Sequence, residues 1–111
     1  MEIVEFYFES INRNMVYKSA HKYVVDTIAA LEKCLNSERE FSENQFSMYQ
    51  KKYNESSKKC NESEYGIVRF YRKSMKSYRQ RLKEIENYFE RLEKVKKSIV
   101  AWKKSSYGKK L

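Results

Sequence analysis

The side chains that most often carry chemistry are scarce in this sequence. There is one histidine, His21, and one aspartate, Asp26, together with two cysteines, Cys34 and Cys60. His21 and Asp26 are five positions apart, so they would not face each other on a helix. A metal site needs clustered ligands and a phosphate-binding loop needs a run of glycines, and the sequence has neither pattern. We therefore expect a protein that is not an enzyme, with no catalytic residue, metal, cofactor or small-molecule substrate.

The composition favours a few long helices. The 111 residues include no proline and only two glycines, whereas sandwiches and barrels need many turns that are built on these residues. We predict a single all-α domain over residues 1–111. It is either a helical hairpin or a three-helix bundle, with a long C-terminal helix of the coiled-coil type.

Changes in the apolar pattern predict where these helices begin and end. The apolar face switches sides at the polar run 12–14, so we expect a short first segment and then a helix over about 14–36. Ser37 and Glu40 have the spacing of a capping box, which begins a new helix, expected over about 38–61. The same capping logic recurs at 61–64. It begins a third helix over about 64–105, followed by a basic tail at 106–111.

The third expected helix carries a heptad seam. Apart from Lys96, its seam positions are apolar and follow alternating steps of four and three, which is typical of a coiled coil. They are Tyr71, Met75, Tyr78, Leu82, Ile85, Phe89, Leu92 and Ile99, with Trp102 at the end. Such a helix extends about 63 Å at about 1.5 Å per residue, and neither earlier helix alone covers that length. We therefore expect part of the seam to be exposed and to bind a helical protein partner or a second copy of the chain.

The positive charge is concentrated towards the C-terminus. Residues 1–63 hold nine Lys/Arg and ten Asp/Glu, whereas residues 64–111 hold fifteen and five, which gives a net charge of +10. Several cations alternate with aromatic residues, as they do in proteins that follow a nucleic-acid backbone. The candidate polyanion-binding residues are Arg72, Lys73, Arg79, Lys103 and Lys104. The alternative interpretation, which the seam spacing favours, is that the aromatics are core residues and the cations are their solvated flanks.

Nothing in the sequence predicts membrane insertion. No apolar run approaches the roughly 20 residues of a membrane span. The first ten residues carry Glu2, Glu5 and Glu9 in place of the basic start of a signal peptide. Two cysteines do not make a disulfide framework, and we expect both as thiols. A cytoplasmic location fits these features.

Three short motifs occur in a recognisable order. Residues 31–34 read Leu-Glu-Lys-Cys, Tyr65-Gly66 is an aromatic–glycine pair, and Phe89 and Glu93 have the spacing of a Phe-x-x-x-Asp export element. This order resembles the small helical-hairpin proteins of type VII secretion, meaning the Trp-x-Gly family and the accessory partners of LXG toxins. The resemblance spans residues 28–100. It implies a targeting or accessory factor for a secreted toxin, exported without a cleavable signal peptide.

The sequence therefore fits three functions. The first is a non-enzymatic adaptor that binds a partner protein through the exposed seam. The second is a nucleic-acid-binding protein of phage or plasmid type, which uses the basic C-terminal helix. The third is a small inhibitor or immunity protein. Salt separates the first two, because phosphate binding weakens steeply with salt whereas apolar burial does not.

Overall fold

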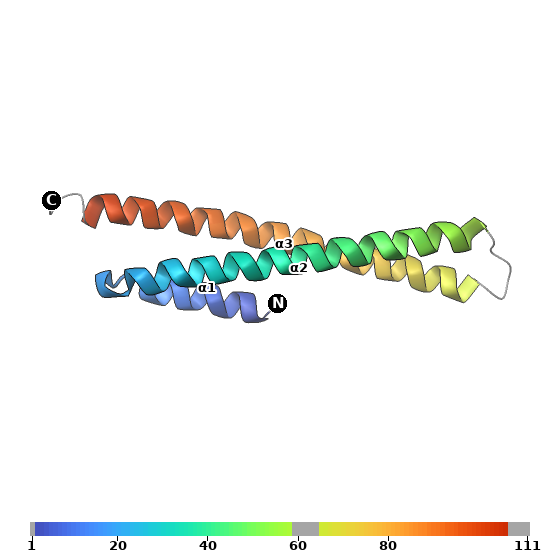
Figure 1. The fold of residues 1–111 in the computed structure, drawn as a ribbon, viewed down its shortest axis with the longest axis horizontal. Helices are drawn as coiled ribbons and strands as arrows, with labels where there is room; N and C mark the ends of the chain where they lie inside the picture. Colours follow the sequence, from blue (N-terminus) through green and yellow to red (C-terminus); the bar gives the residue numbers. More distant parts are fainter. Residues whose placement is uncertain (1, 59–64, 107–111) are drawn as a thin grey trace. The chain divides into compact units, whose positions relative to one another are not determined.

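Every secondary-structure element of the described chain is a helix. The computed structural model describes residues 2–58 and 65–106, with side chains for 2–58 and 66–101. Its elements are α1 (Glu2–Asn14), the short 3-10 helix η1 (Lys18–Ala20), α2 (His21–Lys58) and α3 (Tyr65–Ser106) (Figure 1). No strand occurs in these two ranges. The predicted all-α fold with a long C-terminal helix is confirmed.

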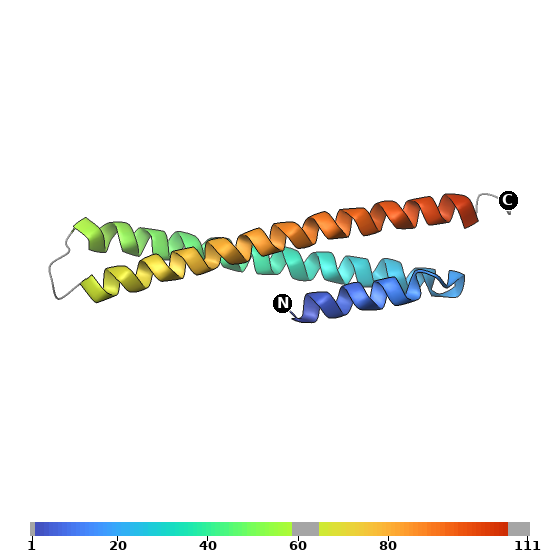
Figure 2. The same cartoon turned by 180° about the vertical axis from the view of Figure 1, so that it is seen from behind.

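The chain forms two compact units. Unit 1 consists of Met1–Asn36 and Asn87–Leu111, and unit 2 consists of Ser37–Glu86. Helices α2 and α3 contribute to both units and run antiparallel in each. Helix α1 belongs to unit 1, where it lies along the first part of α2, as the view from behind shows (Figure 2). The described part of unit 1 is therefore built mainly from α1 and parts of α2 and α3, and the described part of unit 2 from the remaining parts of α2 and α3.

Helix α1 forms because its apolar residues share one face. Val4, Phe8 and Ile11 are spaced by four and three residues, and all three are buried. The acidic residues in its first turn stabilise the helix, because they lie at the positive end of the helix dipole. The helix ends at Asn14, whose side-chain amide donates to the Ser10 carbonyl at 2.8 Å. The polar run at 12–14 thus marks a helix end as expected, but the next α-helix begins at His21 and not near residue 14.

Helix α2 corrects the predicted break at residues 36–38. It runs without interruption from His21 to Lys58, 38 residues, so Ser37 lies inside a helix and does not cap one. Packing on both sides of the expected break outweighs the capping pattern, because Leu35 and Ser42 are fully buried. Glu38 also pairs with Arg81 of α3 across 2.9 Å. Helix α3 begins at Tyr65. Residues 59–64, which include Cys60 and the second predicted capping pattern, lie outside the described residues.

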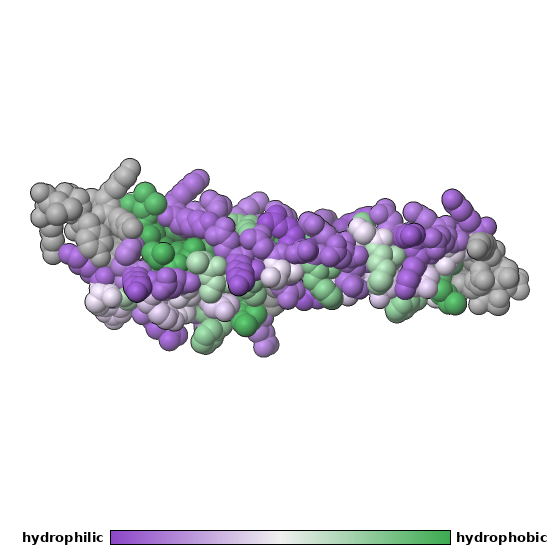
Figure 3. Space-filling view, in the orientation of Figure 1, coloured by the Kyte–Doolittle hydropathy of each residue, from purple (hydrophilic) through white to green (hydrophobic). Residues whose placement is uncertain are grey.

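The larger core belongs to unit 1. Its buried apolar side chains come from all three helices: Val4, Phe8 and Ile11 of α1, Val24, Ile28, Leu31 and Leu35 of α2, and Leu92 and Ile99 of α3. Full burial of each such side chain contributes roughly 1.5–3 kcal/mol. Hydrophilic residues cover most of the surface seen in Figure 3. The core therefore accounts for the apolar pattern of α1 and of the first part of α2.

Unit 2 is held by aromatic packing between α2 and α3. Tyr49 of α2 stacks on Tyr78 of α3 with ring centroids 5.9 Å apart, and it also contacts Tyr71 and Phe70 at 6.1 Å. Phe41 meets Tyr78 edge-on at 6.3 Å. Each such pair contributes about 0.5–1.5 kcal/mol beyond the apolar area that it buries.

Candidate binding surfaces

The heptad seam of α3 packs inside the chain. Ile85, Leu92 and Ile99 are buried, and the other seam residues with described side chains, Tyr71, Met75, Tyr78, Leu82 and Phe89, are half-buried. The expectation of an exposed seam is wrong for these residues, since it assumed that the chain breaks near Ser37. A continuous α2 supplies a packing partner in both units. The side chain of Trp102 lies outside the described residues.

The residues of the proposed export element divide between core and surface. Phe89 is half-buried and packs on the unit 1 core, whereas Glu93 is exposed and lies 3.5 Å from Lys96. Of the five candidate polyanion-binding residues, Arg72, Lys73 and Arg79 are exposed. The side chains of Lys103 and Lys104 and the tail at 107–111 are not among the described residues.

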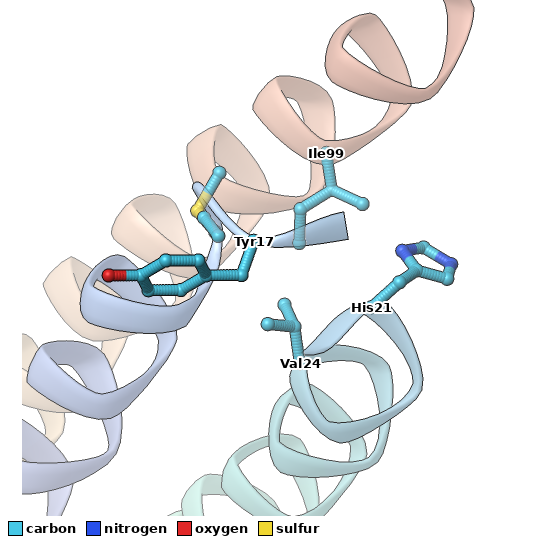
Figure 4. Close-up of a pocket in the computed structure, with 5 residues that line it drawn as sticks. Tyr17, His21, Val24 and Ile99 are labelled. Carbon is cyan, nitrogen blue, oxygen red and sulfur yellow. The ribbon is translucent and has the colours of Figure 1, made fainter. Parts of the chain in front are cut away.

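The residues with catalytic potential are scattered in unit 1. His21 is half-buried at the start of α2 and borders a small pocket with Met15, Tyr17, Val24 and Ile99 (Figure 4). These neighbours are apolar or aromatic and supply no carboxylate to the imidazole. Asp26 is exposed and Cys34 is half-buried, each at another position along α2. Among the described residues, no three His, Cys, Asp or Glu side chains are grouped closely enough to hold a metal ion.

Four exposed apolar side chains mark one side of unit 2, which we call the open side. They are Phe41 (49% exposed) and Met48 (38%) of α2 and Ile67 (50%) and Phe70 (57%) of α3. The Arg81–Glu38 ion pair joins the two helices on this side. Phe41 lies one turn after Glu38, and Phe70 lies about three turns before Arg81 at 3.6 residues per turn. The open side therefore contains contributions from both helices.

In unit 1, α1 shows how such a side is covered. Phe8 of α1 stacks with Tyr88 of α3 at 6.1 Å, and Arg91 of α3 lies 4.1 Å from the Phe8 ring. Arg91 also donates to both carboxylate oxygens of Glu5, at 2.7 and 3.4 Å. This hydrogen bond from Arg91 lowers the pKa of the Glu5 carboxyl. Within unit 1, the α2–α3 pair is thus covered by an amphipathic helix of the same chain, α1, whose first turn is acidic.

The open-side residues of α3 occupy the same heptad positions as the residues of α3 that contact α1. Ile67 lies three heptads before Tyr88, and Phe70 lies three heptads before Arg91. Residues separated by whole heptads occupy the same position of the repeat. Ile67 and Phe70 therefore occupy the positions that, in unit 1, contact α1. In the described part of unit 2, no third helix covers them.

A second surface of unit 2 is basic. Residues 65–83 contain seven Lys/Arg and no Asp/Glu. Five of these cations follow steps of three and four along α3 and are all exposed: Arg69, Arg72, Lys76, Arg79 and Lys83. We call them the basic stripe. At about 100° per residue, they fall within about 80° of one another and about 140° from Phe70. The stripe and the open side therefore lie on different faces of α3.

Two arginines of the basic stripe lie over aromatic rings of α2. The Arg79 guanidinium is 5.3 Å from the centroid of Phe46, and that of Arg72 is 5.7 Å from the centroid of Tyr53. Arg72 also donates to the Tyr53 hydroxyl at 3.2 Å. Both pairs are separated by seven residues along each helix, so the same contact repeats two turns apart. These contacts orient the guanidinium groups, because a cation over a ring face gains about 0.5–1 kcal/mol at an exposed site.

No protein-family profile, curated protein or solved structure matches this chain. In the part of the chain that the structure describes, no helix is both long and apolar enough for a membrane span.

Sequence reasoning missed the open side because it assigned apolar residues to the seam. Phe70 directly precedes the seam residue Tyr71, and Ile67 lies one turn earlier. An apolar residue beside the seam, in a repeat whose other positions are polar, is a signal that could have found the open side. The basic stripe was partly found, through Arg72 and Arg79. Its other members need the helix phase that the structure supplies.

Proposed function

We propose that the protein is a non-enzymatic adaptor that binds a helical partner protein on the open side of unit 2. The observation that carries this proposal is the exposure of Ile67 and Phe70 at heptad positions that contact α1 in unit 1. The proposed occupant is an amphipathic helix with an acidic edge, like α1. The resemblance to accessory partners of LXG toxins supports the same class of function, with a secreted toxin as partner.

Charge at the open side supports an acidic occupant. Lys52 lies one turn after Met48, and Lys73 lies one turn after Phe70, so two of the four exposed apolar side chains have a lysine beside them. Both lysines are exposed, and Lys52 lies 6.0 Å from the Tyr71 ring. Cations beside an apolar surface favour a partner of opposite charge over one of like charge.

The test uses a designed helical peptide as the probe. Two fluorescent peptides of about 20 residues, each long enough for about 30 Å of helix, share a leucine stripe and carry either Glu or Lys along its edges. We expect the Glu peptide to bind and the Lys peptide not to. The double variant Met48→Ala, Phe70→Ala should weaken binding at least about tenfold, which corresponds to about 1.4 kcal/mol.

The matched control is Ile3→Ala, Phe6→Ala. These two residues are exposed apolar side chains of unit 1, so the pair removes similar apolar surface elsewhere. We expect the control to bind the Glu peptide like the unmodified protein. Equal losses in the two double variants, or equal binding of the two peptides, would refute the proposed site. Circular dichroism melting checks that each variant remains folded.

A further inference from the structure

We infer that the basic stripe of α3 binds the phosphate backbone of a nucleic acid without reading its bases. This site is separate from the open side and does not depend on the adaptor function. The stripe, Arg69, Arg72, Lys76, Arg79 and Lys83, is exposed along its whole length. The inference rests on its charge, its spacing and the orientation of its arginines.

Within α3, no acidic side chain is interspersed among the cations of the stripe. Residues 65–83 of α3 hold no acidic side chain, whereas residues 84–93 hold four, Glu84, Glu86, Glu90 and Glu93. Two ion pairs that join α2 and α3 in unit 2, Arg39 with Glu86 and Arg81 with Glu38, involve none of the stripe residues. A solvated helix face usually mixes the two signs of charge. A face of one sign creates a positive potential that attracts polyanions.

The spacing of the stripe suits a chain of phosphates. From Arg69 to Lys83 the stripe extends about 21 Å at about 1.5 Å per residue. One strand of a duplex presents a phosphate about every 3.4 Å of helix axis, so the stripe spans about six phosphates with five cations. A single bound anion would need a compact cluster and not a row.

The aromatic rings under Arg72 and Arg79 orient phosphate-binding groups. Each guanidinium lies over a half-buried ring, Tyr53 or Phe46, which holds the planar group before any ligand arrives. A guanidinium has five N–H donors, so one that lies over a ring retains N–H groups for paired hydrogen bonds to a phosphate. The two rings lie beneath the cations and do not offer a free face to a base. We therefore assign contacts to the phosphate backbone and none to base stacking.

The test measures binding of a fluorescent DNA duplex of about 20 base pairs as a function of salt. Each phosphate contact contributes about 0.9 to the slope of log affinity against log salt. The unmodified protein should show a slope of up to about −4.5, and Arg72→Gln, Arg79→Gln should reduce its magnitude by about 1.8. The control Lys94→Gln, Lys97→Gln removes the same charge from exposed sites of α3 in unit 1 and should leave the slope nearly unchanged.

A second variant separates orientation from charge. Phe46→Leu keeps every cation and a similar apolar volume, so we expect a weaker affinity with an unchanged salt slope. An unchanged affinity would contradict the orienting role of the ring. The Met48→Ala, Phe70→Ala variant, which tests the adaptor function, should bind DNA normally, so the two proposals fail independently.

Three results would overturn the inference. The first is no binding of the duplex at about 50 mM salt, where phosphate contacts are strong. The second is an equal loss of salt slope in the stripe variant and in the Lys94→Gln, Lys97→Gln control. The third is tighter binding to anionic phospholipid vesicles than to the duplex. Single-stranded DNA of the same sequence provides a further comparison. Affinity for the single strand far above that for the duplex would contradict binding to the backbone alone.

Discussion

Single residues matter most in this protein where one side chain serves several neighbours. Arg91 binds Glu5 through two hydrogen bonds and lies over the rings of Phe8 and Tyr88 at 4.1 and 5.7 Å. It thereby connects α1 with α3 through charge and aromatic contact together. Lys96 of α3 has a similar role, because it donates a hydrogen bond to Glu32 of α2 at 3.0 Å. This hydrogen bond raises the pKa of Lys96. Both pairs are partly exposed, so each contributes modestly.

The Glu5–Arg91 pair predicts a dependence of stability on pH. The hydrogen bond from Arg91 lowers the pKa of Glu5 from its ordinary value of 4.5. A carboxyl whose pKa is lowered in the folded protein stabilises the fold at pH values above its ordinary pKa. This contribution is lost as the pH falls through the lowered pKa. We expect Glu5→Gln to lower the free energy of unfolding at neutral pH and to flatten its decline in acid. Urea unfolding at several pH values measures both effects, and Glu9→Gln on the same helix is the control.

At the scale of elements, packing decides where helices end. The capping pattern at Ser37 and Glu40 predicted a break, yet α2 continues because Leu35 and Ser42 are buried and Glu38 and Arg39 pair with α3. The polar run at 12–14 does end a helix, and its first two residues, Asn12 and Arg13, are exposed. Local sequence preferences amount to about 1 kcal/mol or less. A few buried side chains outweigh them.

Substitutions at Ser37 distinguish a helix interior from a cap. Removal of a capping serine costs about 1 kcal/mol, whereas alanine inside an exposed helix is slightly favourable. Because Ser37 is exposed within α2, we expect Ser37→Ala to leave the free energy of unfolding unchanged or raise it by a few tenths of a kcal/mol. Ser37→Pro should lower it by about 3 kcal/mol. Chemical denaturation measures both, and a loss of about 1 kcal/mol in Ser37→Ala would restore the predicted break.

At the scale of the whole molecule, burial is unequal between the two units. The large apolar core lies in unit 1, whereas the buried side chains described in unit 2 are Ser42, Val68 and Ile85. Unit 2 relies on half-buried aromatic pairs and leaves four large apolar side chains exposed. Both proposed binding surfaces belong to this less buried unit. Sites that bind partners are often found in regions of low local stability.

This inequality predicts a difference in amide hydrogen exchange. Amides in residues 24–35 and 88–99, within unit 1, should exchange only at a high opening free energy, close to that of global unfolding. Amides in residues 44–58 and 66–80, within unit 2, should exchange at a lower opening free energy because fewer buried contacts hold their helices. Native-state exchange with mass spectrometry measures the two sets in one sample. Equal protection in both units would contradict the assignment of the main core to unit 1.

The sequence by itself determined the helical class, the extent of α3 and which residues form its seam, but not that the seam is covered within the chain. Few glycines, no proline and a sustained heptad pattern restrict the chain to long helices. The tertiary structure decided the rest. Only packing could show that α2 continues through Ser37, because the buried neighbours of Leu35 and Ser42 come from elsewhere in the chain. The open side and the full basic stripe also needed the structure, because exposure depends on which faces other helices cover, and a single sequence gives each helix only its own periodicity.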